Sequence, residues 1–233
     1  FRIVILKWLM ENLLTPEQVL KKAYASHEKV TISFSGAEDV ILIDMASSFC
    51  EQLFVFSLDT GRLHAETYRF IEDIRNHYGI EIDILSPDNK LLNDFVKEKG
   101  LFSFYQDGHS ECCSVRKIQP LEKHLIHYDA WITGQRKDQS PTRNDLPQEQ
   151  LDLAFSNEHR TIKKYNPLAN WTSNQVWEYI KEQKFREYVL KYNTALIVGE
   201  EAEQSMEAMC YAWEGSTWEE KIKFGKIKIK ISK

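Results

Sequence analysis

Residues 30–39 read Val-Thr-Ile-Ser-Phe-Ser-Gly-Ala-Glu-Asp, and this stretch decides the fold of the 233-residue chain. Its first five residues are β-branched or apolar for the most part and predict a buried strand, and the apolar residues from Val40 onward predict a helix. A turn between a strand and a helix N-terminus offers hydroxyls and backbone N–H groups to an anion. We therefore predict an anion site at Ser33, Ser35 and Gly36, although one glycine also suits an ordinary turn.

Two further strands end in polar or glycine-containing turns. Residues 53–58 predict a strand that ends at Asp59, Thr60 and Gly61, and residues 130–133 predict one that ends at Gly134. Between them, residues 64–78 predict a helix with Tyr68, Ile71, Ile74 and Tyr78 on one apolar face, and residues 80–85 predict a third strand. This alternation predicts an α/β fold with a doubly wound, mostly parallel sheet, in which the three turns gather at one carboxyl edge.

The flanking segments complete the predicted organisation. Thr15-Pro16-Glu17-Gln18 has the pattern of a capped helix start, and residues 171–180 predict another helix. Residues 139–157 are polar, contain two prolines and predict a mobile loop. The alternation of lysine and isoleucine in residues 226–231 predicts a short strand. We expect one α/β domain over residues 1–185 and a divergent C-terminal segment over residues 186–233.

Composition restricts the class of protein. The chain has 42% hydrophobic residues, a formal net charge of −5 and only four cysteines. These numbers favour a core without a disulfide framework and argue against a nucleic-acid coat, which needs clustered positive charge. No apolar stretch approaches the ~20 residues that span a bilayer. We expect a cytoplasmic protein that binds neither nucleic acid nor membrane, and we leave assembly into a homo-oligomer open.

Adjacent cysteines, Cys112 and Cys113, stand directly before Arg116 and Lys117. Neighbouring thiols close only a strained disulfide, so we interpret them as thiolates held by cations or by a metal, as in a sulfur redox enzyme. A pair of reduced, half-buried cysteines is the alternative. Arg116 and Lys117 are candidate partners of phosphate or sulfate oxygens, as are three further basic residues, and four other side chains are expected in the core. The basic residues are Arg136, Lys137 and Arg143, and the core residues are Cys50, Phe102, Phe104 and Tyr105.

Six ordered motifs between about Thr31 and Glu182 resemble the assimilatory sulfonucleotide reductases. The resemblance is greatest to bacterial adenylyl-sulfate (APS) reductases that use thioredoxin. The motifs are Ser-Phe-Ser-Gly-Ala-Glu-Asp-Val, Phe-Ser-Leu-Asp-Thr-Gly-Arg-Leu-His, Lys-Glu-Lys-Gly-Leu-Phe-Ser-Phe-Tyr, Glu-Cys-Cys-Ser-Val-Arg-Lys, Thr-Gly-Gln-Arg-Lys-Asp-Gln-Ser-Pro and Tyr-Asn-Pro-Leu. A related ATP pyrophosphatase or sulfate adenylyltransferase would be expected to carry a glycine-richer Ser-Gly-Gly-x-Asp-Ser loop.

The resemblance implies an adenine nucleotide α-hydrolase-like fold and a set of site residues. In this family the tandem cysteines help to bind a [4Fe-4S] cluster, which makes Cys112 and Cys113 the expected metal ligands, and the residue matching Lys117 couples cluster and substrate electrostatically. Asp39 joins the phosphate loop, and Leu58 lies near the adenine. The expected substrate-binding residues are Ser33, Ser35, Gly36, Asp39, Leu58, Asp59, Thr60, Gly134, Arg136 and Arg143.

The implied activity is that of an oxidoreductase of sulfate assimilation and cysteine biosynthesis. A thiolate attacks the sulfur of APS and releases AMP, and thioredoxin then releases sulfite. Reductases for the 3′-phosphorylated nucleotide (PAPS) commonly lack the tandem cysteines, so Cys112 and Cys113 favour APS. PAPS reduction and a non-catalytic adenine-nucleotide-binding paralogue are the alternatives.

The region after residue 185 departs from the family pattern. The family has a downstream Cys-x-x-Cys and a nucleophile in Glu-Cys-Gly-Leu-His, and the printed sequence contains neither. Cys210 is its only cysteine after Cys113 and is the candidate nucleophile. A sequence error, degeneration and a true rearrangement are the competing explanations of this segment.

Overall fold

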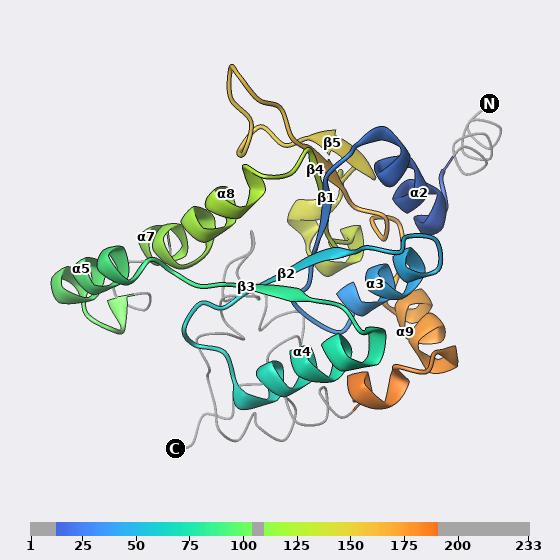
Figure 1. Ribbon diagram of the computed structural model, residues 1–233, viewed down its shortest axis with the longest axis horizontal. Coiled ribbons are helices and arrows are strands. Elements are labelled where there is room, and N and C mark those ends of the chain that lie inside the picture. The colour runs from blue at the N-terminus through green and yellow to red at the C-terminus, as the bar shows by residue number, and fades with distance from the viewer. Residues whose placement is uncertain (1–12, 104–109, 191–233) are drawn as a thin grey trace.

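A six-stranded sheet with the order β3-β2-β1-β4-β6-β5 forms the centre of the protein (Figure 1). The computed structural model describes residues 13–103 and 110–190. All neighbouring strands pair in parallel except β5, which is antiparallel to β6. The strands are β1 (Val30–Ser33), β2 (Phe54–Leu58), β3 (Ile82–Leu85), β4 (Ala130–Ile132), β5 (Glu149–Leu151) and β6 (Lys163–Tyr165).

Helices pack on both faces of this sheet, as the doubly wound prediction requires. Side chains of α2, α3, α4 and α9 share one core cluster with Ile32 and Val55, whereas α8 packs on Phe56 and Trp131, which point to the other face. The helices are α2 (Pro16–Ser26), α3 (Asp39–Ser47), α4 (Ala65–Tyr78), α5 (Asn89–Lys99), α7 (Ser110–Cys113), the π-helix η1 (Ser114–Ile118), α8 (Gln119–Leu125), the 3-10 helices η2 (Lys137–Gln139) and η3 (Pro141–Arg143), and α9 (Ser173–Glu182).

Helix starts follow the local sequence signals. Thr15 caps α2 in a reciprocal pair with Gln18, and Thr172 caps α9 in the same way with Gln175. In each pair the threonine hydroxyl accepts from a backbone N–H while the glutamine side chain accepts from the cap residue's own N–H. The prediction of a capped helix from Thr15 is confirmed.

Three local predictions are corrected by the structure. Residues 139–157 do not form a featureless loop, because they contain η3 and the edge strand β5. Tyr68 is 43% exposed, since the buried face of α4 is formed by neighbouring positions such as Phe70 and Ile74. Phe102 is 62% exposed and is not a core residue. Phe104, Tyr105 and residues 226–231 lie outside the described residues.

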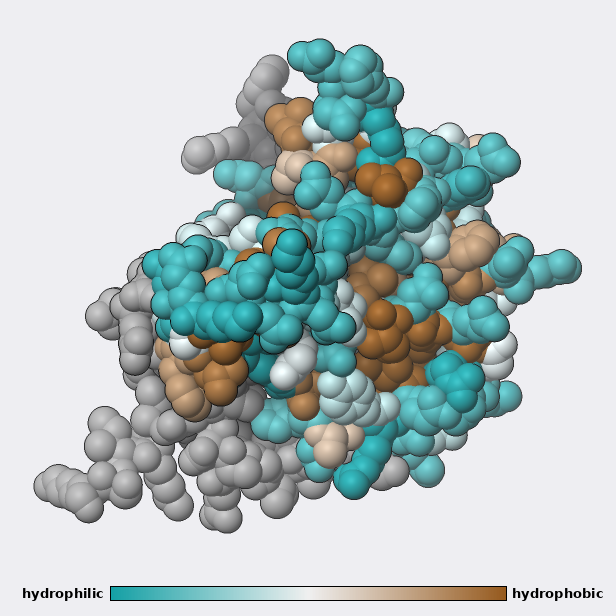
Figure 2. All heavy atoms as spheres, turned by 60° about the vertical axis from the view of Figure 1, so that its left-hand side comes forward, coloured by the Kyte–Doolittle hydropathy of each residue, from teal (hydrophilic) through white to brown (hydrophobic). Residues whose placement is uncertain are grey.

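The face of the molecule shown in Figure 2 is mainly hydrophilic, with separate groups of exposed apolar side chains. Ile84 of β3, Ile118 of η1 and Ile126 after α8 are among the exposed large apolar residues. Within the described ranges, no helix combines the length and the hydropathy that a membrane crossing needs.

Candidate functional site

The three predicted turns do meet at one edge of the sheet. β1 lies between β2 and β4 and pairs in parallel with both, so the segments that follow these strands leave the sheet on the same side. They are residues 34–38, residues 59–64 and residues 133–136. Ser33 ends β1 opposite Phe56 and is half-buried at this edge.

Asp39 is the hub of this edge. Its Oδ2 accepts hydrogen bonds from the backbone N–H of Ser35 (2.7 Å), from the Ser35 hydroxyl (2.7 Å) and from the N–H of Gly36 (3.0 Å). Its Oδ1 accepts from the N–H of Gly134 (3.1 Å). The carboxylate therefore ties the loop after β1 to the loop after β4. Burial raises the pKa of Asp39 to about 6, and the hydrogen bonds from Ser35 oppose that rise.

This arrangement changes the interpretation of the loop. The N–H groups of Ser35 and Gly36, which we expected to hold a ligand anion, already donate to an internal carboxylate. The N–H groups of Ala37 and Glu38 donate to no other residue that the structure describes, and they precede the first turn of α3. These two groups are the loop donors that remain for a bound anion.

Glycine is required at position 134 because the backbone there lies close to Asp39, and not because of the backbone angles of Gly134. A Cβ at this position would lie 2.1 Å from Asp39 Oδ1 and 3.6 Å from the Asp39 Cα. Gly134 does not have a positive φ, whereas Gly61, Gly79 and Gly100 do. The absence of a side chain at position 134 therefore allows the loop after β4 to contact Asp39 at the start of α3.

Hydrogen bonds to Asp59 fasten the turn after β2. Asp59 accepts hydrogen bonds from the N–H of Gly61 (2.8 Å) and from the hydroxyl of the exposed Tyr68 (2.8 Å). Leu58 is half-buried, and Thr60 is only 1% exposed. The predicted site residues of this strand end therefore lie beside β1, as the topology requires.

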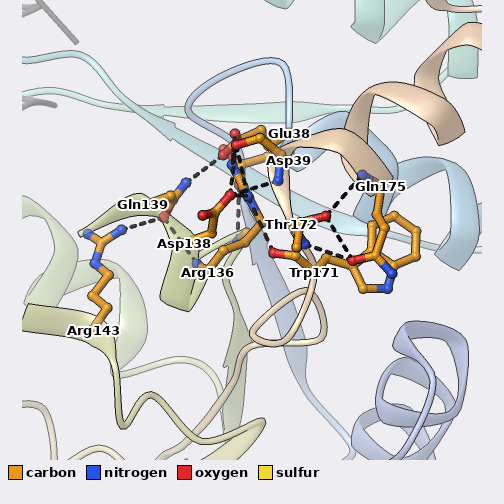
Figure 3. A network of polar contacts seen from close by, with 11 residues as sticks. Glu38, Asp39, Arg136, Asp138, Gln139, Arg143, Trp171, Thr172 and Gln175 are labelled. Carbon is orange, nitrogen blue, oxygen red and sulfur yellow. Dashed lines mark hydrogen bonds and ion pairs between the residues drawn. The ribbon is translucent and has the colours of Figure 1, made fainter. Parts of the chain in front are cut away.

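Arg136 is buried in a polar network that joins three segments (Figure 3). Its guanidinium donates to Glu38, at the start of α3, and makes a 3.3 Å ion pair with Asp138. Asp138 in turn accepts from the N–H and hydroxyl of Ser173, at 2.7 Å and 2.9 Å, and so caps α9. Two carboxylates therefore surround the guanidinium in this structure.

Two further basic residues of the prediction lie in the same region. Arg143 donates to the side-chain oxygen of Gln139, whose amide donates to Glu38 (2.5 Å). Lys137 Nζ donates to Asn170 Oδ1 (2.8 Å). The structure thus brings Arg136 and Arg143 into one network, and their contact with a ligand remains a prediction.

We expect Arg136→Met to lower the free energy of unfolding by about 2–3 kcal/mol, because it leaves two carboxylates without their buried cation. Urea denaturation checks this value. Arg75→Met is the matched control, since Arg75 also forms an arginine–glutamate pair, with Glu72, but on the exposed surface of α4, where an ion pair contributes little. Equal losses in the two variants would contradict a structural role of the Arg136 network.

The cysteine pair lies where an α-helical turn passes into a π-helix. Cys112 is buried, Cys113 is half-buried, and η1 begins at the next residue. A π-helical turn inside a helix often marks a functional site. From this turn Arg116 Nη1 reaches the carbonyl oxygen of Thr60 at 2.6 Å and so connects the cysteine helix to the end of β2. Lys117 is half-buried in the same turn.

Arg116 was expected among the basic partners of phosphate or sulfate oxygens, but its burial was not predicted. The signal in the sequence was its place in a basic pair just after Cys112 and Cys113, and basic pairs are otherwise common on surfaces. Its burial, at 4% exposure, depends on the π-helical turn and could not be read from the spacing of residues.

The thiols of the described residues do not make up the ligand set of a four-iron cluster. Such a cluster takes four ligands, commonly cysteine thiolates. Within residues 13–103 and 110–190, no group of three His, Cys, Asp or Glu side chains could hold a metal ion. Cys50 follows α3 and precedes β2, at the opposite edge of the sheet from Cys112. Cys210 lies outside the described residues.

The fold and the strand-end site define the class as adenine nucleotide α-hydrolase-like. The phosphoadenosine phosphosulfate reductase domain family matches residues 29–199, and the chain belongs to this family. A solved phosphoadenylyl-sulfate reductase from Candida auris, in a phosphate complex, is 25% identical with a TM-score of 0.58, over 72% of this chain and 79% of that one. Candida glabrata FMN adenylyltransferase in complex with ATP, 14% identical with a TM-score of 0.50 over 71% and 52% of the two chains, shares the fold.

Curated relatives are similar over the same share of the chain. An adenosine 5′-phosphosulfate reductase of Pseudomonas aeruginosa is 56% identical over 72% of this chain and 63% of its own length. The chloroplastic 5′-adenylylsulfate reductase 1 of Arabidopsis thaliana is 47% identical over 72% of this chain and 37% of its own length. A reductase of Neisseria meningitidis is 36% identical over 74% of this chain and 70% of its own length. The chain therefore spans less than two thirds of the first two relatives.

Proposed function

We propose that the protein is an adenylyl-sulfate reductase of sulfate assimilation, which converts APS to sulfite and AMP with thioredoxin as electron donor. The observation that carries the proposal is the bond from Arg116 to the Thr60 carbonyl, because it brings the tandem cysteine helix to the strand edge that the nucleotide loop shares. The similarity to adenosine 5′-phosphosulfate reductases supports the choice of APS. We propose the cytoplasm as its compartment.

The nucleotide half of the proposed site is formed at the carboxyl edge of the sheet. Asp39 holds the loop in shape, and we assign the N–H groups of Ala37 and Glu38 as donors to the phosphate. Leu58 supplies an apolar contact for the base. The proposed substrate-binding residues are Ser33, Ser35, Gly36, Asp39, Leu58, Asp59, Thr60, Gly134, Arg136 and Arg143.

The proposed reaction is thiol chemistry. The Cys210 thiolate attacks the sulfur of APS, a sulfur–sulfur bond forms, and the sulfur–oxygen bond breaks so that AMP leaves with the electron pair. One thioredoxin thiolate then attacks the cysteine sulfur and expels sulfite, and the second thioredoxin thiol resolves the mixed disulfide and returns Cys210 as a thiol. Lys117 contributes positive charge near the sulfate oxygens. No step is assigned to an iron–sulfur cluster.

The test is thioredoxin-dependent sulfite release from APS by anaerobically prepared protein, with the iron content measured on the same sample. We expect release from wild type, loss of release in Cys210→Ala, and release in the control Cys50→Ala, whose thiol lies at the other edge of the sheet. Wild-type protein that binds APS but releases no sulfite would replace this proposal with that of a non-catalytic nucleotide binder.

PAPS is the second candidate substrate. The family description and the Candida auris structure both name this nucleotide. A comparison of kcat/KM for APS and PAPS decides between them. A higher value for PAPS would overturn the choice of APS.

A further inference from the structure

Glu38 combines two opposite properties at the carboxyl edge of the sheet. Its backbone N–H is one of the two loop donors that remain for an anion. Its side chain carries a carboxylate, of which one oxygen accepts from Arg136 Nη2 and the other accepts from the Gln139 amide at 2.5 Å. A phosphate group bound at the N–H of Glu38 would therefore have a negative charge of the same residue as its neighbour.

The cation of this network is already used by internal carboxylates. Arg136 is paired with Glu38 and also with Asp138, at 3.3 Å, and its side chain is only 3% exposed. Charges in such a partly buried network are screened little by salt and water, so an additional anion would be repelled by the two carboxylates. Binding of an anion beside Arg136 therefore requires that one of them leaves.

The two carboxylates are held in different ways (Figure 3). Asp138 accepts from the backbone N–H and the hydroxyl of Ser173, so its departure would uncap α9. Glu38 is held only by the side chains of Arg136 and Gln139 among the described residues, and its own side chain does not cap α3. The Glu38 side chain is also 32% exposed, so its carboxylate can turn into water without a change of the backbone.

We propose that Glu38 is an internal competitor of the nucleotide. In the ligand-free protein its carboxylate occupies the donors of Arg136 and Gln139, and a phosphate group of the nucleotide displaces it from them. The space for the anion is the space that this carboxylate leaves. Competition of this kind weakens the apparent affinity in proportion to the fraction of molecules in which the carboxylate is bound. The choice of an adenine nucleotide as the ligand rests on the proposed function.

The test is the dissociation constant of AMP, measured by calorimetry on the full chain at constant ionic strength. We expect Glu38→Gln to bind AMP about fivefold more tightly than wild type, because a neutral amide competes weakly for a guanidinium and does not repel a phosphate. Adenosine, which has no phosphate, should bind both proteins equally. A gain of affinity for AMP alone is not a result that damage to the fold produces.

Glu72→Gln is the matched control. It removes the same charge and also breaks an arginine–glutamate pair, with Arg75, but on the exposed surface of α4. Its dissociation constant for AMP should stay within about twofold of the wild-type value, since exposed charges are well screened.

Asp138→Asn separates displacement from simple repulsion. Asparagine keeps an acceptor for Ser173 but removes a negative charge that also faces Arg136. If Glu38 must leave before the phosphate binds, Glu38→Gln gains affinity for AMP and Asp138→Asn does not. An equal gain in both variants would show that the loss of any nearby negative charge is sufficient, and it would overturn the competition.

An affinity of Glu38→Gln for AMP that equals or falls below that of wild type would also overturn the inference. The experiment measures binding without turnover, so its outcome is separate from that of the reductase proposal. AMP binding without sulfite release would overturn the reductase alone. The absence of AMP binding to folded wild type and to Glu38→Gln would overturn the competition together with the nucleotide site.

Discussion

Gly134→Ala is expected to destabilise the protein by about 3 kcal/mol and to abolish measurable nucleotide binding, because overpacking of a buried contact is costly. The new Cβ would lie 2.1 Å from Asp39 Oδ1, and the Asp39 Cα at 3.6 Å limits the space into which the carboxylate can move. Either the Asp39 carboxylate must leave its hydrogen bonds, or the loop after β4 must move away from the start of α3. The free energy of unfolding in urea and the dissociation constant of AMP measure the two effects.

Gly36→Ala is the matched control for this prediction. Gly36 belongs to the same site, but a Cβ at this position would meet nothing within 4 Å, and Gly36 does not have a positive φ. We expect a change in stability of less than about 1 kcal/mol. Similar losses in the two variants would show that the contact with Asp39 is not the reason for glycine at position 134.

Asp39→Asn is expected to lower stability by about 2 kcal/mol, because an asparagine amide cannot accept all four hydrogen bonds. Oδ2 receives three donors and Oδ1 receives one, so either orientation of the amide turns an NH₂ group toward a backbone N–H. Nucleotide binding should weaken with the loss of loop order. A variant as stable as wild type would contradict the role of Asp39 as the hub.

The pH dependence of the stability of wild type and Asp39→Asn gives a second test of the role of Asp39. The pKa of Asp39 is raised to about 6 in the folded protein, above its ordinary value of 3.8, so the folded state holds this proton more tightly than the unfolded state. Protonation of Asp39 therefore stabilises the folded state. This stabilisation is fully present below pH 3.8 and is lost as the pH rises through 6. The stability difference between wild type and Asp39→Asn should therefore narrow by about 2 kcal/mol between pH 4 and pH 7. If the stability difference between the two proteins did not change with pH, the raised pKa of Asp39 would contribute nothing to stability.

The meeting of three strand ends at one edge of the sheet could be predicted, because these three strands are apolar. Residues 30–34, 53–58 and 130–133 are β-branched or aromatic runs, and parallel pairing of such strands brings their ends together. β5 and β6 were missed for the opposite reason. Glu149–Leu151 and Lys163–Tyr165 are three-residue segments with mainly polar side chains, and only pairing with each other and with β4 makes them strands.

The predicted site residues come together at one edge, but their contacts could not be predicted. The sequence suggested that Ser35 and Gly36 would donate to a ligand, whereas their N–H groups donate to Asp39, four and three residues away. An Asp at this spacing is also what an ordinary helix start would contain. The same carboxylate also accepts a hydrogen bond from the N–H of Gly134. This contact depends on the packing of β4 beside β1, which no local sequence pattern predicts.

The separation along the chain of Asp39 and Gly134, 95 residues, has a consequence for folding. A contact of this kind forms only after β1 and β4 have paired across the whole intervening segment, and loops of such length close slowly. The nucleotide site is therefore expected to be among the last parts of the protein to form. In a refolding experiment, the recovery of AMP binding would lag behind the recovery of helical circular dichroism and would report the completion of the sheet.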